Sequence, residues 1–248
     1  MTSPHYNTIA KPYRKSREQD WCSIEKYTLF SHLPDLSNLK VLDIPCGEGV
    51  YARPLKLLGA ATVIGIDLSP KMIELAQQDE RVNPLDIQYR VANVTKLEYE
   101  KEFDLVVSAY LFNYAHTTEE LTKYCNNIFK AIKPGGQLVG LNDNPYNKPY
   151  DYGLYEKYGL IKTCRLPRTT GTPITYTMVN NDGSSCSFDN YYHSPEGYQD
   201  AFKNAGFINF EWINLVLSKK HLAADNVSHW NCLIDKAPVI AFKAFRSN

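Results

Sequence analysis

The sequence lacks long apolar runs and an excess of charge of either sign. No stretch of the 248 residues approaches the roughly 18 apolar residues that span a bilayer. The first 16 residues are polar and lack the apolar segment of a secretory signal. Lys and Arg together number 27, as do Asp and Glu, so the formal net charge is zero. We therefore expect a soluble, cytoplasmic protein without a membrane or a nucleic acid as its partner.

Closely spaced cysteine motifs are also missing. The chain has no Cys-x-x-Cys pair, and its six cysteines are scattered: Cys22, Cys46, Cys125, Cys164, Cys186 and Cys232. Without an export signal, this spacing predicts free thiols and no metal site. Hydrophobic residues make up 44% of the chain and charged residues 22%, so an ordinary globular core can form.

Strand-like apolar runs alternate with helical segments through much of the chain. Strands are expected at 41–44, 62–66, 87–91, 103–107, 137–141, 207–217 and 238–245, and helices at 50–58, from Ser69 onward, at 118–132 and at 194–206. Strands that alternate with helices form a parallel sheet covered on both faces. The sequence therefore predicts an α/β, Rossmann-like fold with a seven-stranded, mostly parallel sheet.

Residues 143–192 are too many for an ordinary connection after the fifth strand. Runs of β-like composition at 172–179 and 185–192 flank the turn sequence Asn181-Asp182-Gly183, which predicts a small antiparallel lid. A helix is expected over 16–33, with Trp21, Ile24, Thr28 and Leu29 toward the core. We expect one domain, with N-terminal cover helices in 1–38, a core of 39–142 and 193–248, and the lid of 143–192.

The turn after the first strand is rich in glycine and carries an acidic residue. Ligands of such sheets bind at the carboxyl ends of the strands. The pattern Gly47-x-Gly49-x-x-Ala52 is typical of dinucleotide-binding turns, but Asp43 would repel a pyrophosphate there. Asp67, after the second strand, can accept both hydroxyls of a single ribose. These residues favour a nucleoside that carries a cationic ammonium and sulfonium.

Four segments in order resemble the motifs of class I S-adenosylmethionine (SAM) methyltransferases: Asp43-Ile-Pro-Cys-Gly-Glu-Gly49, Ile66-Asp-Leu-Ser69, Phe103-Asp-Leu-Val106 and Lys133-Pro-Gly-Gly136. The resemblance implies SAM as cofactor and S-adenosylhomocysteine (SAH) as product. The cofactor-binding residues that it implies are Tyr13, Asp43, Gly47, Gly49, Asp67, Leu68, Asn93, Val94 and Ser108. Asn93 stands where the family usually has Asp, so the contact with the adenine amino group would lose a charge.

A narrower resemblance reaches most of the chain. Residues 6–13, 110–115, 142–145, 157–159, 190–192 and 205–207 are similar to the toxoflavin synthase group, whose members N-methylate a pyrimidotriazine. The resemblance implies a small, flat acceptor that is methylated on a ring nitrogen.

The acceptor is expected between the fourth-strand exit, the N-terminal segment and the lid. These regions supply Tyr6, Tyr110, Asn113, Tyr114, Asn144, Tyr146, Tyr191 and Tyr192, of which Tyr110, Asn113 and Tyr114 would position the acceptor. Aromatic faces stack flat ligands, and Asn reads ring nitrogens and carbonyls. A ring nitrogen needs little help from a base, whereas a hydroxyl acceptor would need one, and the candidates are His116 and His193.

Three other functions remain open from the residues alone. The first is O- or carboxyl-methylation of a small natural product. The second is a nicotinamide (NAD)-dependent oxidoreductase that uses the Gly47-x-Gly49 turn, and the third is a nucleotide-binding protein without catalysis. The chain could act as a monomer or a homodimer.

Overall fold

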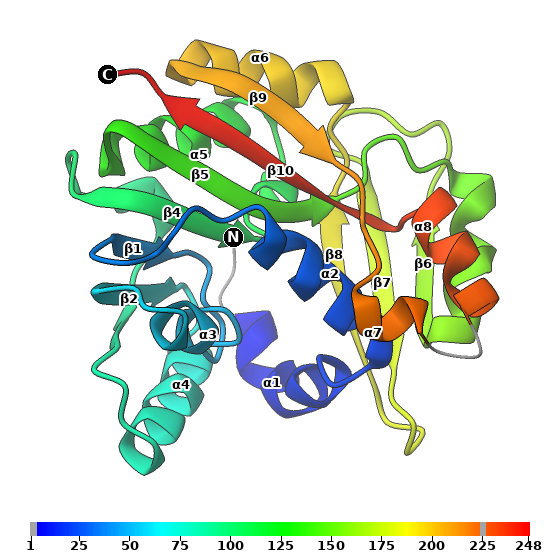
Figure 1. Cartoon of the computed structure of the whole chain (residues 1–248). Helices are drawn as coiled ribbons and strands as arrows, with labels where there is room; N and C mark the ends of the chain where they lie inside the picture. Colours follow the sequence, from blue (N-terminus) through cyan, green and yellow to red (C-terminus); the bar gives the residue numbers. More distant parts are fainter. Residues whose placement is uncertain (1–3, 224–226) are drawn as a thin grey trace.

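The computed structural model describes residues 4–223 and 227–248 and contains a central sheet of seven strands (Figure 1). The strand order is β3-β2-β1-β4-β5-β10-β9. The strands are β1 (Lys40–Asp43), β2 (Thr62–Asp67), β3 (Gln88–Val91), β4 (Phe103–Ala109), β5 (Ile132–Asp143), β9 (Phe207–Ile213) and β10 (Val239–Arg246). β1 to β5 run parallel, and β10 is antiparallel to both of its neighbours. The predicted Rossmann-like, mostly parallel sheet is confirmed.

Helices cover both faces of this sheet, as its apolar strands require. α2 (Asp20–Ser31), α3 (Ala52–Leu57) and α4 (Pro70–Val82) bury Leu29, Leu55 and Ile73 against one face. α5 (Thr118–Ala131) and α6 (Pro195–Ala205) bury Ile128 and Phe202 against the other. Two short 3₁₀ turns, η1 (Val94–Lys96) and η2 (Phe112–Tyr114), follow β3 and β4.

The helix starts follow the hydroxyl caps in the sequence. Ser69 Oγ accepts a hydrogen bond from the backbone N–H of Met72 and is followed by Pro70. Ser194 Oγ does the same for Gly197 at the start of α6. These bonds satisfy N–H groups that a first helical turn leaves unpaired, so both predicted helix starts are confirmed.

The N-terminal region forms two helices instead of the single helix predicted over 16–33. α1 (Pro4–Ser16) ends before a turn at residues 17–19, and α2 follows. The prediction missed α1, whose sequence is polar and contains Pro12, a residue that weakens a helix interior. The inward side of α2 was predicted correctly: Trp21, Ile24, Thr28 and Leu29 are all buried.

The predicted lid is a separate antiparallel sheet in the order β6-β7-β8, seen at the right of Figure 1. It comprises β6 (Leu160–Cys164), β7 (Pro173–Val179) and β8 (Ser185–Tyr191). The β7–β8 hairpin closes at the predicted turn, where Asn180 N–H donates to the Ser184 carbonyl at 2.8 Å. β6 and the preceding 3₁₀ segment η3 (Pro149–Tyr158) were not predicted.

The chain between β9 and β10 contains short helical pieces. They are α7 (Lys219–Leu222), η4 (Val227–Trp230) and α8 (Asn231–Asp235). β9 ends at Ile213, four residues short of the predicted strand. All six cysteines are free thiols. No helix within the two described ranges has the length and apolar character needed to cross a membrane.

Candidate functional site

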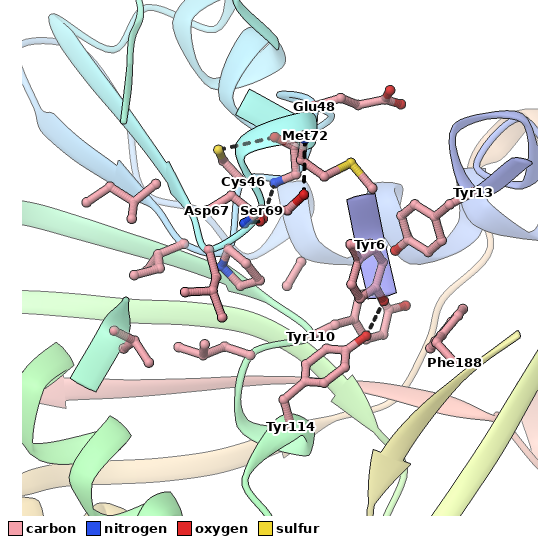
Figure 2. A pocket seen from close by; sticks show the side chains of 18 of the residues that line it. Tyr6, Tyr13, Cys46, Glu48, Asp67, Ser69, Met72, Tyr110, Tyr114 and Phe188 are labelled. Carbon is pink, nitrogen blue, oxygen red and sulfur yellow. Dashed lines mark hydrogen bonds between the residues drawn. The ribbon is translucent and has the colours of Figure 1, made fainter. Parts of the chain in front are cut away.

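A cavity of about 330 Å³ lies at the carboxyl ends of β1, β2, β3 and β4. The loops that follow these strands line its floor, while α1 and β8 contribute residues from the opposite side (Figure 2). Its volume falls at the lower end of the range for small-molecule sites. The cavity therefore occupies the edge of the sheet at which the sequence predicts a ligand.

Asp67 organises the floor of the cavity. One carboxylate oxygen accepts a hydrogen bond from the Gly47 N–H at 2.9 Å, and the other accepts one from the Ser69 N–H at 2.8 Å. Burial raises the pKa of Asp67, although these backbone donors oppose the shift. The carboxylate thus joins the β1 and β2 loops and still lines the cavity.

The structure brings most of the predicted cofactor-binding residues to this cavity. Six line it: Tyr13, Gly47, Asp67, Leu68, Asn93 and Val94. Asn93 differs from the expectation in one respect. Its side-chain oxygen already accepts hydrogen bonds from the Thr95 N–H at 2.9 Å and the Thr95 hydroxyl at 3.0 Å. That oxygen holds the η1 turn, so the predicted bond to an adenine amino group would have to compete with Thr95.

Asp43, Gly49 and Ser108 do not line the cavity. Asp43 is fully buried, and burial raises its pKa well above the ordinary value. Gly49 has φ +91°, and a Cβ atom there would overlap the hydroxyl of Tyr89. Ser108 is also fully buried. None of these three residues therefore offers a surface that a cofactor in the cavity could contact directly, as their predicted roles require.

Glu48, within the Gly47-x-Gly49 turn, brings an acidic side chain to the cavity in place of Asp43. Its carboxylate lies 3.3 Å from the Nε of Arg14 on α1. Burial raises the pKa of Glu48 to about 7, although Arg14 opposes the shift. Prediction from sequence missed Glu48, but its place between the two glycines marks it as a residue of the turn.

The raised pKa makes the stability of the fold depend on pH. The unfolded chain ionises Glu48 near pH 4.5 and the folded chain near pH 7, so this group favours folding at low pH and loses that contribution as pH rises to 7. Glu48→Gln removes the titration. Between pH 5 and pH 8, we expect the unfolding free energy of Glu48→Gln to rise by about 2.5 kcal/mol relative to that of the unsubstituted chain.

Urea unfolding of both proteins at the two pH values measures this change. The exposed Glu18→Gln variant is the matched control and should retain the pH dependence of the unsubstituted chain. An unfolding difference between Glu48→Gln and the unsubstituted chain that stays constant from pH 5 to pH 8 contradicts the assignment.

Arg17 is a buried cation on the cavity wall, and it was not predicted either. It follows Tyr13 by four residues, a spacing that places both on one side of a helical turn. Its guanidinium forms an ion pair with the fully buried Glu25 and lies 3.1 Å from the Tyr51 hydroxyl. The Tyr110 hydroxyl donates to the other oxygen of Glu25. This network joins α2, the β1 loop and the exit of β4.

Aromatic side chains line one end of the cavity: Tyr6, Tyr13, Tyr110, Tyr114, Phe188 and Tyr191. Figure 2 shows Tyr6 and Tyr13 on α1 facing Tyr114 and Phe188 across this end. The hydroxyls of Tyr6 and Tyr114 are hydrogen-bonded to each other. The ring of Tyr13 packs edge-on against Tyr6 at 5.3 Å and against Phe188 at 5.6 Å. Burial raises the pKa of Tyr6, Tyr110 and Tyr114, so these phenols stay neutral.

The two candidate bases lie in different places. His116 is exposed at the rim of the cavity and stacks on Tyr191 at 3.8 Å. His193 is buried, and its Nε2 lies 2.9 Å from the Ala115 carbonyl. Burial lowers the pKa of His193. His193 does not line the cavity, so the geometry leaves His116 as the histidine that could meet an acceptor.

Four predicted acceptor residues do not line the cavity. Asn113 is fully buried, and Tyr146 is exposed on the surface. The Asn144 side chain closes a local turn, because its oxygen accepts the Tyr146 N–H and its nitrogen donates to the Ala237 carbonyl. The ring of Tyr192 lies 4.0 Å from the Arg168 guanidinium. Each of these side chains has a place outside the cavity, and none enters the site proposed below.

Comparison with known proteins agrees with this geometry. Residues 41–136 match the methyltransferase domain family. A ubiquinone biosynthesis O-methyltransferase from Pelagibacter ubique is 34% identical over 119 residues, which cover 48% of this chain and 45% of that protein. The mitochondrial enzyme of the same name from Rattus norvegicus is 36% identical over 48% of this chain and 35% of its own length. The chain thus spans about half the length, or less, of these curated relatives.

Solved structures share the fold at low sequence identity. A SAM-dependent methyltransferase from Mesorhizobium loti has a TM-score of 0.65 and 20% identity, covering 90% of this chain and 98% of that one. Phosphoethanolamine N-methyltransferase 2 of Haemonchus contortus, solved with SAM, has a TM-score of 0.65 and 18% identity, covering 100% of this chain and 60% of that one. The narrower likeness to the toxoflavin synthase group is not shown by these comparisons. Residues 41–136 therefore match a methyltransferase domain, and most of the chain shares the fold of SAM-dependent methyltransferases of known structure.

Proposed function

We propose that this protein transfers the methyl group of SAM to a small, planar acceptor. The observation that carries the proposal is the division of one cavity into two chemically distinct ends. Asp67, Leu68, Asn93 and Val94 line the end at β2 and β3, and aromatic rings line the end at α1 and β8. A nucleoside suits the first end and a flat ring suits the second.

The residues of the floor fit the charges of SAM. We assign Asp67 to the ribose hydroxyls, because its half-buried carboxylate lines the cavity. Glu48 supplies an acidic group for the ammonium, and Arg17 supplies a cation for the carboxylate of the methionine part. This assignment moves the predicted role of Asp43 to Glu48. The bound cofactor supplies the electrophilic methyl group, so the protein mainly positions the reactants and excludes water.

The acceptor is proposed to be methylated on a ring nitrogen. The buried phenols at the aromatic end are neutral and have raised pKa values, so they are poor bases. A ring nitrogen brings its own lone pair and needs no base. In this arrangement, the N-terminal helices and the 143–192 lid close over the core as parts of one domain.

Methylation of a hydroxyl is the second candidate function. The curated relatives described above are named as O-methyltransferases, and His116 at the rim could accept a proton. The match of residues 41–136 to a methyltransferase domain favours methyl transfer over the nicotinamide-dependent oxidoreductase considered from the sequence alone.

The reaction of the full chain with SAM and a panel of planar nitrogen heterocycles and phenols tests the proposal, with SAH release as the readout. For the acceptor that reacts, we expect His116→Ala to retain most of kcat and the shape of the pH–rate profile from pH 6 to pH 9. His32→Ala, a histidine at the end of α2, is the control. A loss of about a hundredfold in kcat for His116→Ala would instead identify a histidine base and a hydroxyl acceptor.

A further inference from the structure

A small chamber adjoins the aromatic end of the cavity. Its volume is about 20 Å³, close to the room that one water molecule or one hydroxyl or amino group occupies. It shares five lining residues with the larger cavity, among them Tyr110, Tyr114 and Phe188, whereas Asn190 on β8 lines the chamber and not the larger cavity. The chamber is therefore a side pocket of the proposed acceptor site.

Several hydrogen-bond donors around the chamber are already engaged. Arg17 binds Glu25 and Tyr51, and Trp21 Nε1 donates to the Gln19 side chain at 2.7 Å. The hydroxyls of two chamber tyrosines donate to carboxylates: Tyr110 to Glu25 and Tyr176 to Asp143. The bonds of Trp21, Tyr110 and Tyr176 direct these three donors toward protein acceptors instead of into the chamber.

Asn190 differs from these groups. Its side-chain oxygen is buried and, in the part of the chain that the structure describes, has no hydrogen-bond partner. The whole residue is only 2% exposed. Buried amide oxygens in native proteins are almost always paired, with a protein group, a water or a ligand. A carbonyl oxygen can only accept a hydrogen bond, so its missing partner must be a donor.

The strand ladder fixes this oxygen relative to the aromatic wall. Asn190 pairs with Ile174 on β7, and Phe188, two residues earlier on the same face of β8, pairs with Tyr176. The rings of Phe188 and Tyr176 are stacked at 5.6 Å with an interplanar angle of 8°. An acceptor ring against Phe188 would thus meet Asn190 at a defined position.

We propose that the side-chain oxygen of Asn190 selects the acceptor by accepting a hydrogen bond from its ring N–H, amino or hydroxyl group. The donor group enters the small chamber while the ring stays in the larger cavity beside Phe188. The inference rests on the proposed function and names its substrate class: planar rings that carry a hydrogen-bond donor. Analogues in which that donor is methylated are rejected, because they leave the oxygen unpaired and overfill the chamber.

Ligand-observed NMR on the full chain saturated with SAH tests this selection. The probes are three pairs that differ by methylation of the donors: indole and 1-methylindole, lumazine and 1,3-dimethyllumazine, and catechol and 1,2-dimethoxybenzene. For at least one pair, we expect the donor compound to bind at least tenfold more tightly. Asn190→Leu, which is close in size, should reduce that preference to less than threefold, and Asn190→Asp should retain it.

Asn180→Leu is the matched control. Asn180 lies at the far end of the same hairpin, is 5% exposed and also has an unpaired side-chain oxygen among the described residues, but it lines neither cavity. It should keep the preference of the unsubstituted chain.

Calorimetry with SAH on every variant separates this inference from the proposed function. If the unsubstituted chain does not bind SAH, the proposed function and the inference that rests on it both fail. If SAH binds normally, the inference alone is overturned by any of three results: no probe binds, no pair is discriminated, or the preference survives in Asn190→Leu.

Discussion

Replacing Lys162 with alanine is expected to lower the free energy of unfolding by about 3–5 kcal/mol. The Lys162 side chain is fully buried, and its ammonium donates to Asp143 at 2.7 Å, to the Asn147 side chain at 3.1 Å and to the Pro238 carbonyl at 3.2 Å. Burial lowers its pKa, whereas the attraction of Asp143 raises it. Without the ammonium, the carboxylate of Asp143 is left buried with one hydroxyl donor, that of Tyr176.

The loss should be visible in urea unfolding at pH 7, and two further variants identify its cause. A double variant, Lys162→Met with Asp143→Asn, removes both charges and should cost much less than the single substitution. Lys243→Ala breaks the more exposed ion pair with Glu211 and should cost less than about 1 kcal/mol. A loss below 1 kcal/mol for Lys162→Ala would contradict the view that this ion pair stabilises the packing of β6 against the end of β5.

Asp67→Ala is expected to weaken SAH binding by about 10- to 150-fold, or about 1.5–3 kcal/mol. The substitution removes a charged acceptor for the ribose, and it also frees the N–H groups of Gly47 and Ser69 that shape the floor of the cavity. Asp67→Asn keeps one acceptor oxygen, so its SAH affinity should lie between those of Asp67→Ala and the unsubstituted chain.

Calorimetric titration with SAH measures these affinities. Asp104→Ala is the control: this carboxylate binds Lys133 near the start of β4, at the opposite end of the sheet. It should leave the SAH affinity within about twofold. If Asp67→Ala binds SAH as tightly as the unsubstituted chain, the ribose does not meet Asp67.

The fold could be predicted where local and tertiary signals agree. The central strands β1, β2 and β4 are buried on both faces. The Ser69-Pro70 and Ser194-Pro195 pairs supply a cap and a fixed φ at the helix starts. α1 could not be predicted from its own residues. It is held from outside, through the ion pair of Arg14 with Asp79 at 2.7 Å and a hydrogen bond between Asn7 and Ser69.

The cavity floor was predicted better than its walls. Gly47, Asp67 and Asn93 follow directly from their place after a strand, because the carboxyl ends of parallel strands share one edge. Residue type alone could not separate Tyr191, which lines the cavity, from Tyr192, which packs against Arg168.

The wall residues depend on how distant elements pack. Arg17, in the turn after α1, is held at the cavity wall by its ion pair with Glu25 on α2, and no local sequence pattern specifies that pairing. Phe188 was missed even though the period of two along β8 places it with Cys186 and Asn190 on the buried face. That period was the signal that could have found it.

Calorimetric titration of the full chain with SAH and, separately, with NAD⁺ distinguishes a methyltransferase from a nicotinamide-dependent enzyme. We expect one SAH bound per chain with a Kd in the micromolar range, about −8 kcal/mol, and no comparable binding of NAD⁺. Tight binding of NAD⁺ without detectable binding of SAH would contradict this expectation.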